Sequence, residues 1–293
     1  MPSCAGLRAH VELSKISGYI VCETFRVAPR NLKPSHSVNS IDTALSMLQA
    51  WQSQLPISLQ MPDDLSHADP SCCVLHMAHN QLVLLTTRPI FFAAVKQAVA
   101  QRIVENRTYT ERHSQGRHIQ ACSIAAHRNL LLAQRITQSS RKLLQAGMHF
   151  VFNAAVILLL NRIMSAQDVD VGQVAGHGLT MTPAQIQHES SIHFAIQTFE
   201  EEARTGTNYP RDCCRVLQDL RALTERYLAS RYPLLEQKVM SDHIHASQAD
   251  NANAYPVDLQ MAQPALGESD EIYEEMMTWV QSDGLQLDNS LFL

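Results

Sequence analysis

Cysteine and histidine side chains lie close together in the segment from Cys72 to His79. On a helix, Cys72, His76 and His79 fall on one face, and thiolate and imidazole groups are ligands that suit zinc. Four ligands from one helix rarely close a tetrahedron, however, and the same face continues into Val83, which is typical of packing. We therefore interpret these side chains, together with Cys73, as core residues and expect no metal ion or other cofactor in this chain.

A second group of candidate ligands consists of Asp63, Asp64 and Asp69. These acids resemble the carboxylate clusters that hold magnesium for diphosphate substrates in helical terpene cyclases. The alternative function is therefore an all-α enzyme that acts on an apolar, isoprenoid-like substrate. That chemistry needs a second carboxylate site, which the sequence does not show. The three acids also lie between Pro62 and Pro70, where turn residues are expected, so a solvated loop is the favoured interpretation.

The sequence contains none of the common short motifs of catalysis or nucleotide binding. It has no GxSxG nucleophile elbow, no phosphate-binding glycine loop, no HExxH and no dinucleotide fingerprint. We expect no catalytic residues and predict that the chain is not an enzyme.

Composition predicts an all-α fold. The 293 residues are 45% hydrophobic, which is enough for a sizeable core, but only ten are glycine and 6% are aromatic. A sandwich or barrel needs more turns and more β-forming residues. Successive helices separated by loops predict a large multi-helix bundle, orthogonal or solenoid-like. The sequence shows no repeat of fixed period, which disfavours a true repeat array.

Charge and cysteine usage describe the expected environment of the chain. Residues 1–238 hold 23 basic and 18 acidic side chains, a formal charge of +5, whereas the remaining ten acids follow Lys238 without any basic partner. The seven cysteines do not resemble a secreted disulfide framework. The apolar run from Phe150 to Leu160 is interrupted by Asn153 and is too short for a bilayer span. We expect a soluble intracellular protein without a membrane partner.

Apolar periodicity and helix breakers place the expected helices along the chain. Ser40 is an expected N-cap, prolines mark a loop over 56–70, and Pro89 predicts a break or kink near Arg88 in the following long helix. The expected helices cover 7–25, 40–55, the segment from Ser71 to about Ile103, 117–145, 148–164, 183–203, and a last one through Cys213 and Tyr227.

The end of the chain differs in composition from the body. Residues 239–266 are expected to form a flexible linker, and 267–293 an acidic tail that is disordered on its own. On a helix, Ile272, Met276, Trp279 and Val280 have i, i+4, i+7 and i+8 spacing and so form one apolar face. We predict that this face binds a partner's hydrophobic groove as an activation segment. In the alternative, Trp279 docks on the helical body.

Three ordered segments resemble the fungal-specific transcription factor domain, the middle homology region of fungal regulators with a zinc binuclear cluster. Leu75 to Phe91, with Arg88-Pro89 near its end, resembles a long helix of that family. Leu13 to Ile20 looks like the preceding helix, and Leu48 to Pro56 resembles the family's Trp-then-Leu-Pro element. The resemblance extends by pattern over residues 7–230, so we assign 1–238 as the regulatory domain.

The resemblance implies a nuclear regulator of transcription that controls a metabolic or secondary-metabolite pathway. Members of the family normally carry six closely spaced cysteines that hold two zinc ions and read DNA, whereas Cys4 and Cys22 stand alone before Cys72. We therefore expect no sequence-specific DNA binding by this chain alone. The expected partners are the transcription machinery or a complete zinc-cluster regulator, and the resemblance also allows a small-molecule effector and a homo- or heterodimer.

Overall fold

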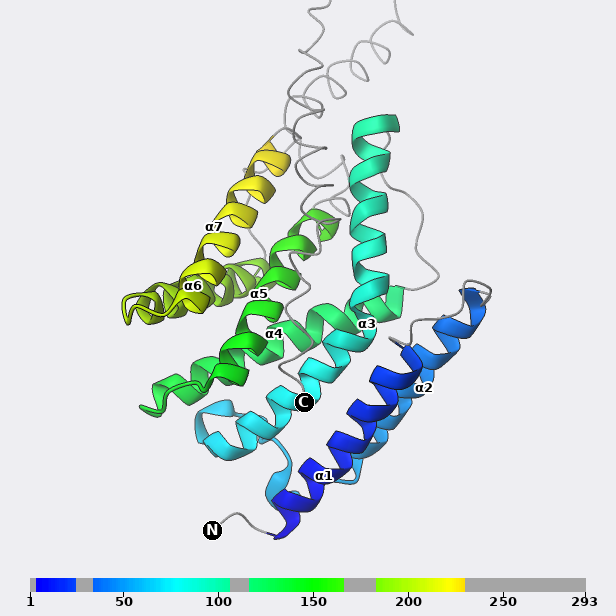
Figure 1. Ribbon diagram of the computed structural model, residues 1–293, viewed down its shortest axis with the longest axis vertical. Helices are drawn as coiled ribbons and strands as arrows, with labels where there is room; N and C mark the ends of the chain where they lie inside the picture. The colour runs from blue at the N-terminus through cyan, green and yellow to red at the C-terminus, as the bar shows by residue number, and fades with distance from the viewer. Residues whose placement is uncertain (1–3, 25–33, 106–115, 166–182, 230–293) are drawn as a thin grey trace, which may run out of the picture. The chain divides into compact units, whose positions relative to one another are not determined.

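The computed structural model describes residues 4–24, 34–105, 116–165 and 183–229 (Figure 1). Within these ranges the chain forms helices and no β-strand, so the expected all-α class is confirmed. The predicted linker, 239–266, and the predicted activation tail, 267–293, lie outside the described residues.

The described residues fall into two compact units that share three helices. Unit 1 contains the described residues of 1–93, 112–158 and 183–217, and unit 2 those of 94–111, 159–182 and 218–293. The sequence predicts one helical domain over 1–238, and the described residues of both units lie within that range. The long helices α3, α5 and α7 each contribute to both units.

Two neighbouring helices begin unit 1. Helix α1 spans Cys4–Tyr19 and continues as a short π-helix over Ile20–Thr24, and α2 spans Pro34–Ser53. They lie side by side (Figure 1). The expected start of the second helix at Ser40 was wrong by six residues, because proline suits the first turn of a helix, where its missing N–H has no partner to lose.

The connection between α2 and α3 contains two 3-10 turns, Ile57–Leu59 and Leu65–His67. Its backbone is held locally, with the N–H of Leu59 donating to the carbonyl of Pro56 at 2.8 Å and the Gln60 side chain donating to the carbonyl of Leu55 at 2.9 Å. The expected loop is therefore present, and local hydrogen bonds hold its backbone. It places the carbonyl of Leu59 against α3.

Helix α3 spans Pro70–Glu105 as one element with Pro89 in its interior. Of the break or kink expected near Arg88, the break is absent, because the helix continues through Pro89. Pro89 cannot donate to the carbonyl of Leu85, but the two preceding threonines add hydrogen bonds within the helix. The hydroxyls of Thr86 and Thr87 donate to the carbonyls of Leu82 and Val83, each at 2.7 Å.

Four further helices complete the described chain. They are α4 (Gly116–Gln138), α5 (Gln145–Ser165), α6 (Pro183–Ala203) and α7 (Asn208–Ala229). The prediction for 183–203 is confirmed at both ends, and the region expected as 117–145 ends earlier, at Gln138. In unit 1, α5 contacts α6 through Phe152 and Phe199, whose rings meet edge to face at 6.1 Å.

Among the described residues, two helices are long and apolar enough to cross a membrane by length and composition alone, Pro70–Ala100 and Gln145–Ser165. The run from Phe150 to Leu160 was expected to be too short for a bilayer span. That expectation was wrong about the length of the helix, since α5 extends beyond both residues. Every residue from Val151 to Leu160 is buried. A buried core helix has the same length and composition as a membrane span, so this feature does not separate the two.

In the described part of unit 2, Glu225 of α7 lies near two arginines. It accepts from Arg221 one turn earlier at 2.9 Å, and its carboxylate lies 4.0 Å from Arg162 of α5. These pairs are partly exposed, so each stabilises the fold by no more than about 1 kcal/mol.

Candidate functional site

Two members of the cysteine and histidine group, Cys72 and His76, hydrogen-bond the same backbone oxygen. The thiol of Cys72 donates to the carbonyl of Leu59 at 3.1 Å, and Nε2 of His76 donates to the same oxygen at 2.8 Å. Because a carbonyl has two lone pairs, both donors are accommodated. Burial raises the pKa of the Cys72 thiol and lowers the pKa of the His76 imidazole. The thiol therefore stays protonated, which disfavours the thiolate that zinc needs.

The other histidine of the group is held between helices. Nε2 of His79 lies 3.2 Å from the carbonyl of Leu48, and its ring stacks on Trp51. The Trp51 indole N–H in turn donates to the carbonyl of Ala9 at 3.0 Å. Within the described ranges, no group of three or more His, Cys, Asp or Glu side chains could hold a metal ion. These residues thus connect α1, α2 and α3.

The carboxylates of the loop act at helix starts. Asp64 accepts from the N–H of Ser66 at 2.9 Å and caps the second 3-10 turn. Asp69 accepts from the N–H groups of Ser71 and Cys72, at 2.7 and 3.3 Å, and caps α3. These hydrogen bonds lower the pKa of both acids. Asp63 is exposed and does not join them.

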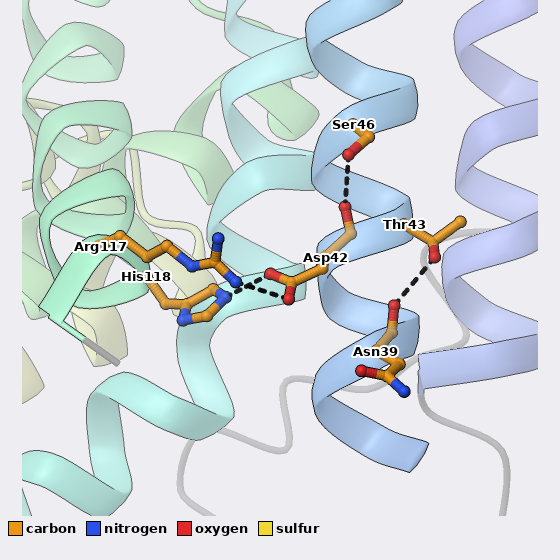
Figure 2. A network of polar contacts seen from close by, with 6 residues as sticks. All are labelled: Asn39, Asp42, Thr43, Ser46, Arg117 and His118. Atoms are coloured by element: carbon orange, nitrogen blue, oxygen red, sulfur yellow. Dashed lines mark hydrogen bonds and ion pairs between the residues drawn. The ribbon is translucent and has the colours of Figure 1, made fainter. Parts of the chain in front are cut away.

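A third polar group joins α2 to α4. Figure 2 shows Arg117 and His118 of α4 pointing together toward Asp42 of α2. The Asp42 carboxylate accepts from Arg117 at 2.6 Å and from Nε2 of His118 at 2.8 Å. His118 is only 1% exposed, and because a carboxylate can only accept, Nε2 must hold the proton. Thr43 and Ser46 donate to backbone carbonyls of α2 itself. This group fixes the start of α4 against α2.

A fourth polar group lies around Arg88 in unit 1. Arg88 of α3 is partly buried, and desolvation lowers the pKa of its guanidinium. Its charge acts on Cys122 of α4 and on His149 of α5. Cys122 is fully buried and shares a hydrogen bond with Thr87. The Arg88 guanidinium therefore lies where α3, α4 and α5 come together.

His149 begins a chain of hydrogen bonds that reaches α7. Asn153, one turn later on α5, lies 3.0 Å from His149 Nε2, and Tyr209 of α7 places its hydroxyl 3.4 Å from His149 Nδ1. The Tyr209 hydroxyl also bonds the thiol of Cys213. We call Arg88, His149, Asn153, Tyr209 and Cys213 the Arg88 cluster. It is the candidate functional site of the molecule.

Sequence reasoning did not find the Arg88 cluster. The sequence singled out Arg88 only for the Arg-Pro resemblance and the expected break or kink, and Asn153 only as an interruption of an apolar run. His149 and Asn153 have i, i+4 spacing on an otherwise apolar helix, a signal that could have suggested a buried polar pair. Tyr209 lies 60 residues from His149, and no local pattern connects them. The predicted partner-binding residues Ile272, Met276, Trp279 and Val280 fall outside the described ranges.

Two buried amides are a separate feature of unit 1. Gln81 of α3 and Asn129 of α4 are 1% and 0% exposed, and neither the oxygen nor the nitrogen of either side chain has a hydrogen-bond partner among the described residues. An unpaired buried polar group destabilises the fold by roughly 1–3 kcal/mol.

Comparisons of this chain with family profiles, curated proteins and solved structures give no match.

Proposed function

We propose that this chain is a regulatory module of transcription, in which the helical body controls activity and the acidic tail contacts the transcription machinery. The sequence resemblance to the fungal-specific transcription factor domain motivates the proposal. In this view the chain acts in the nucleus and regulates a metabolic or secondary-metabolite pathway.

The observation that supports the proposal is the packing of the three resembling segments into one body. A single hydrophobic cluster contains residues from each segment, including Leu13 and Ile16, Leu48 and Trp51, and Leu82. The segments are also joined by polar contacts, because Trp51 donates to the backbone of α1 and His79 bonds the backbone of α2. Segments that resemble one family domain in order are expected to pack together if they form that domain.

DNA recognition is the part of the function that this chain does not supply in the proposal. The six-cysteine zinc cluster that reads DNA in the family has no counterpart among the cysteines of this sequence. A zinc-cluster module must therefore come from a partner regulator or from a further segment of a longer protein. The chain then sets the output of a complex whose position on DNA is chosen elsewhere.

Tethering the chain to DNA tests the proposal directly. The full chain is fused to an unrelated DNA-binding domain and measured on one reporter with a weak promoter and one with a strong promoter. We expect output to change severalfold on at least one of them, since either activation or repression fits a regulator. The DNA-binding domain alone is the control. An inert fusion on both reporters, with the protein expressed in the nucleus, contradicts the proposal.

A further inference from the structure

Helix α1 presents an apolar stripe to solvent, on the side opposite the residues that it buries. Leu7 and Val11, two large apolar side chains, are 65% and 47% exposed. Ser14 and Gly18 continue the stripe in steps of three and four residues, which is the spacing of a coiled-coil seam. Both are exposed, and a side chain at Gly18 would meet no other atom of the described chain. We call these four residues the α1 stripe, in which two large members are followed by two small ones.

One edge of the α1 stripe is basic. Arg8 and Lys15 each directly follow a stripe residue and are exposed, and because they are one heptad apart, both lie on the same edge. Neither forms an ion pair with another described residue. Glu12 lies farther round the helix, at a position that a helix packed on the stripe does not contact. A helix that covers the stripe should therefore be apolar along its centre and acidic along the facing edge.

The acidic segment over residues 268–279 has this pattern in its sequence, and it lies outside the described residues. Its apolar seam consists of Ile272, Met276 and Trp279. These residues follow one another in steps of four and three, as the first three residues of the α1 stripe do. Glu268 and Glu275 are one heptad apart beside that seam. The segment therefore matches the α1 stripe in spacing and opposes it in charge.

A parallel two-helix coiled coil brings the two patterns into register. It sets each seam residue of the acidic segment against one residue of the α1 stripe, Ile272 against Leu7, Met276 against Val11 and Trp279 against Ser14. The largest ring then lies over a small residue, where the stripe leaves room for it. The positions that flank the seam bring Glu268 beside Arg8 and Glu275 beside Lys15. Both basic side chains at the edge of the stripe thus gain an acidic partner.

A second copy of α1 fits the stripe less well. An antiparallel pair of α1 helices sets Arg8 of one copy beside Lys15 of the other, and like charges oppose such a contact. A parallel pair sets the small residues Ser14 and Gly18 against themselves, which leaves a gap without packing contacts. Two large apolar side chains are also few for a stable dimer, which buries about 1,200 Å² or more.

A segment of the same chain needs less contact area than a separate molecule. A tether gives it an effective concentration of about millimolar, so a weak contact can still be occupied. The 38 residues between Ala229 and Glu268 reach as far as roughly 125 Å when fully extended. Charge, spacing and reach therefore all favour the acidic segment of the same chain.

We propose that the α1 stripe binds the acidic segment of the same chain, residues 268–279, as a parallel two-helix coiled coil. An isolated helix of this length is marginal in water, so the segment is expected to be helical only while it is docked. The inference goes beyond the proposed function and does not depend on it, because docking is measured on the purified chain without any transcriptional output.

Acrylamide quenching of Trp279 fluorescence in the purified full chain tests the proposal. The chain has two tryptophans, and Trp51 is only 4% exposed, so subtracting the signal of Trp279→Phe isolates that of Trp279. A peptide of residues 267–293 is the undocked reference. We expect the quenching constant of Trp279 to be severalfold lower in the full chain than in the peptide, at every protein concentration. Equal quenching in both overturns the proposal, and so does protection that grows with protein concentration, which indicates a second copy.

Two double variants locate the docking surface. Leu7→Gln with Val11→Gln should raise the quenching constant of Trp279 to that of the peptide, and because both side chains are exposed, the core is left intact. The matched control is Ile124→Gln with Ile186→Gln, which replaces apolar side chains that are 44% and 56% exposed on α4 and α6. The control should keep the wild-type quenching constant. Protection of Trp279 that survives in the α1 variant overturns the proposal, and so does an equal loss of protection in both variants.

A charge exchange tests the register of the coiled coil. Arg8→Glu with Lys15→Glu should expose Trp279 to acrylamide, because acids then face acids along the edge of the stripe. Adding Glu268→Arg with Glu275→Lys should restore at least half of the lost protection, since each pair is opposite in charge again. Unchanged protection in the first variant overturns the proposed coiled coil, and so does a fourfold variant in which Trp279 stays as exposed as in the peptide.

Discussion

The imidazole of His79 stacks on the indole of Trp51, with 5.1 Å between the ring centroids and 14° between the ring planes. Each ring also bonds a backbone carbonyl of another helix, His79 that of Leu48 and Trp51 that of Ala9. The pair therefore places two polar ring nitrogens in the core without leaving either one unsatisfied.

Acidification should destabilise the protein through its buried and partly buried histidines. Desolvation is the main cause that lowers the pKa of five imidazoles, those of His76, His79, His127, His149 and His188. In the unfolded chain these groups return toward the ordinary value of 6.5, so below that pH the unfolded state binds more protons. The stability is fully present above about pH 6.5 and is lost as pH falls toward the lower folded pKa values.

Thermal melts between pH 7.5 and pH 5 check this prediction. The wild-type melting temperature should fall with pH, and His79→Gln should reduce the slope, because glutamine can still donate to the Leu48 carbonyl but does not titrate. His193→Gln, at an exposed position of α6, is the matched control and should keep the wild-type slope. A slope that is identical in all three proteins contradicts the assignment.

Zinc should remain sub-stoichiometric after dialysis of the purified protein, because the Leu59 carbonyl already holds the Cys72 thiol and the His76 imidazole. His76→Ala should instead lower the free energy of unfolding by about 1 kcal/mol or more, through the lost hydrogen bond. Elemental analysis and denaturant melts measure the two effects. One equivalent of zinc retained by the wild type and absent from His76→Ala would establish a metal site here.

Substitutions of the acids in the loop before α3 should change stability only where the acid caps a helix. Asp69→Ala removes the acceptor for Ser71 and Cys72 at the start of α3 and should lower stability by about 1 kcal/mol. Asp63→Ala, at an exposed position of the same loop, should leave stability unchanged. The double variant with Asp63→Ala and Asp64→Ala tests the enzyme alternative, and we expect its magnesium affinity to equal that of the wild type. Reduced affinity in magnesium titration calorimetry would favour a diphosphate enzyme.

Replacing a buried unpaired amide should stabilise the protein. Gln81→Met keeps the shape of the side chain while removing two polar atoms that have no partner among the described residues, and we expect it to gain roughly 1 kcal/mol. Gln120→Met, at an exposed position of α4, is the control and should change little. A lower melting temperature in Gln81→Met would indicate that water or a ligand satisfies the amide.

The acidic tail should activate transcription through its apolar face. Residues 267–293, fused to an unrelated DNA-binding domain, should drive a reporter, and the double variant Trp279→Ala with Met276→Ala should lose most of that output. Replacing Glu274 and Glu275 by Gln should preserve it, because the carboxylates mainly provide solubility and steering. An inert fusion contradicts the groove interpretation, and so does output that follows the glutamates alone.

Local sequence signals predicted the helices well where caps and apolar spacing agree. Pro183 and the apolar residues that follow it placed α6 at both ends. In contrast, α2 begins at Pro34, ahead of the expected N-cap Ser40, and α3 continues through Pro89, where a break or kink was expected. Proline excludes a donor but tolerates both positions when neighbouring contacts stabilise the helix. Local signals could not predict the Arg88 cluster, since it joins side chains from three helices, α3, α5 and α7, that are distant in sequence.

The Leu59 carbonyl, which accepts from both Cys72 and His76, limits how related chains can vary. The acceptor is a backbone oxygen, so hydrogen bonding to Cys72 and His76 places no demand on the side chain at position 59, where only packing selects an apolar residue. What is constrained is spacing, because the acceptor precedes its two donors by 13 and 17 residues. Substitutions at position 59 should therefore be tolerated during divergence more readily than a one-residue insertion or deletion between Leu59 and Cys72.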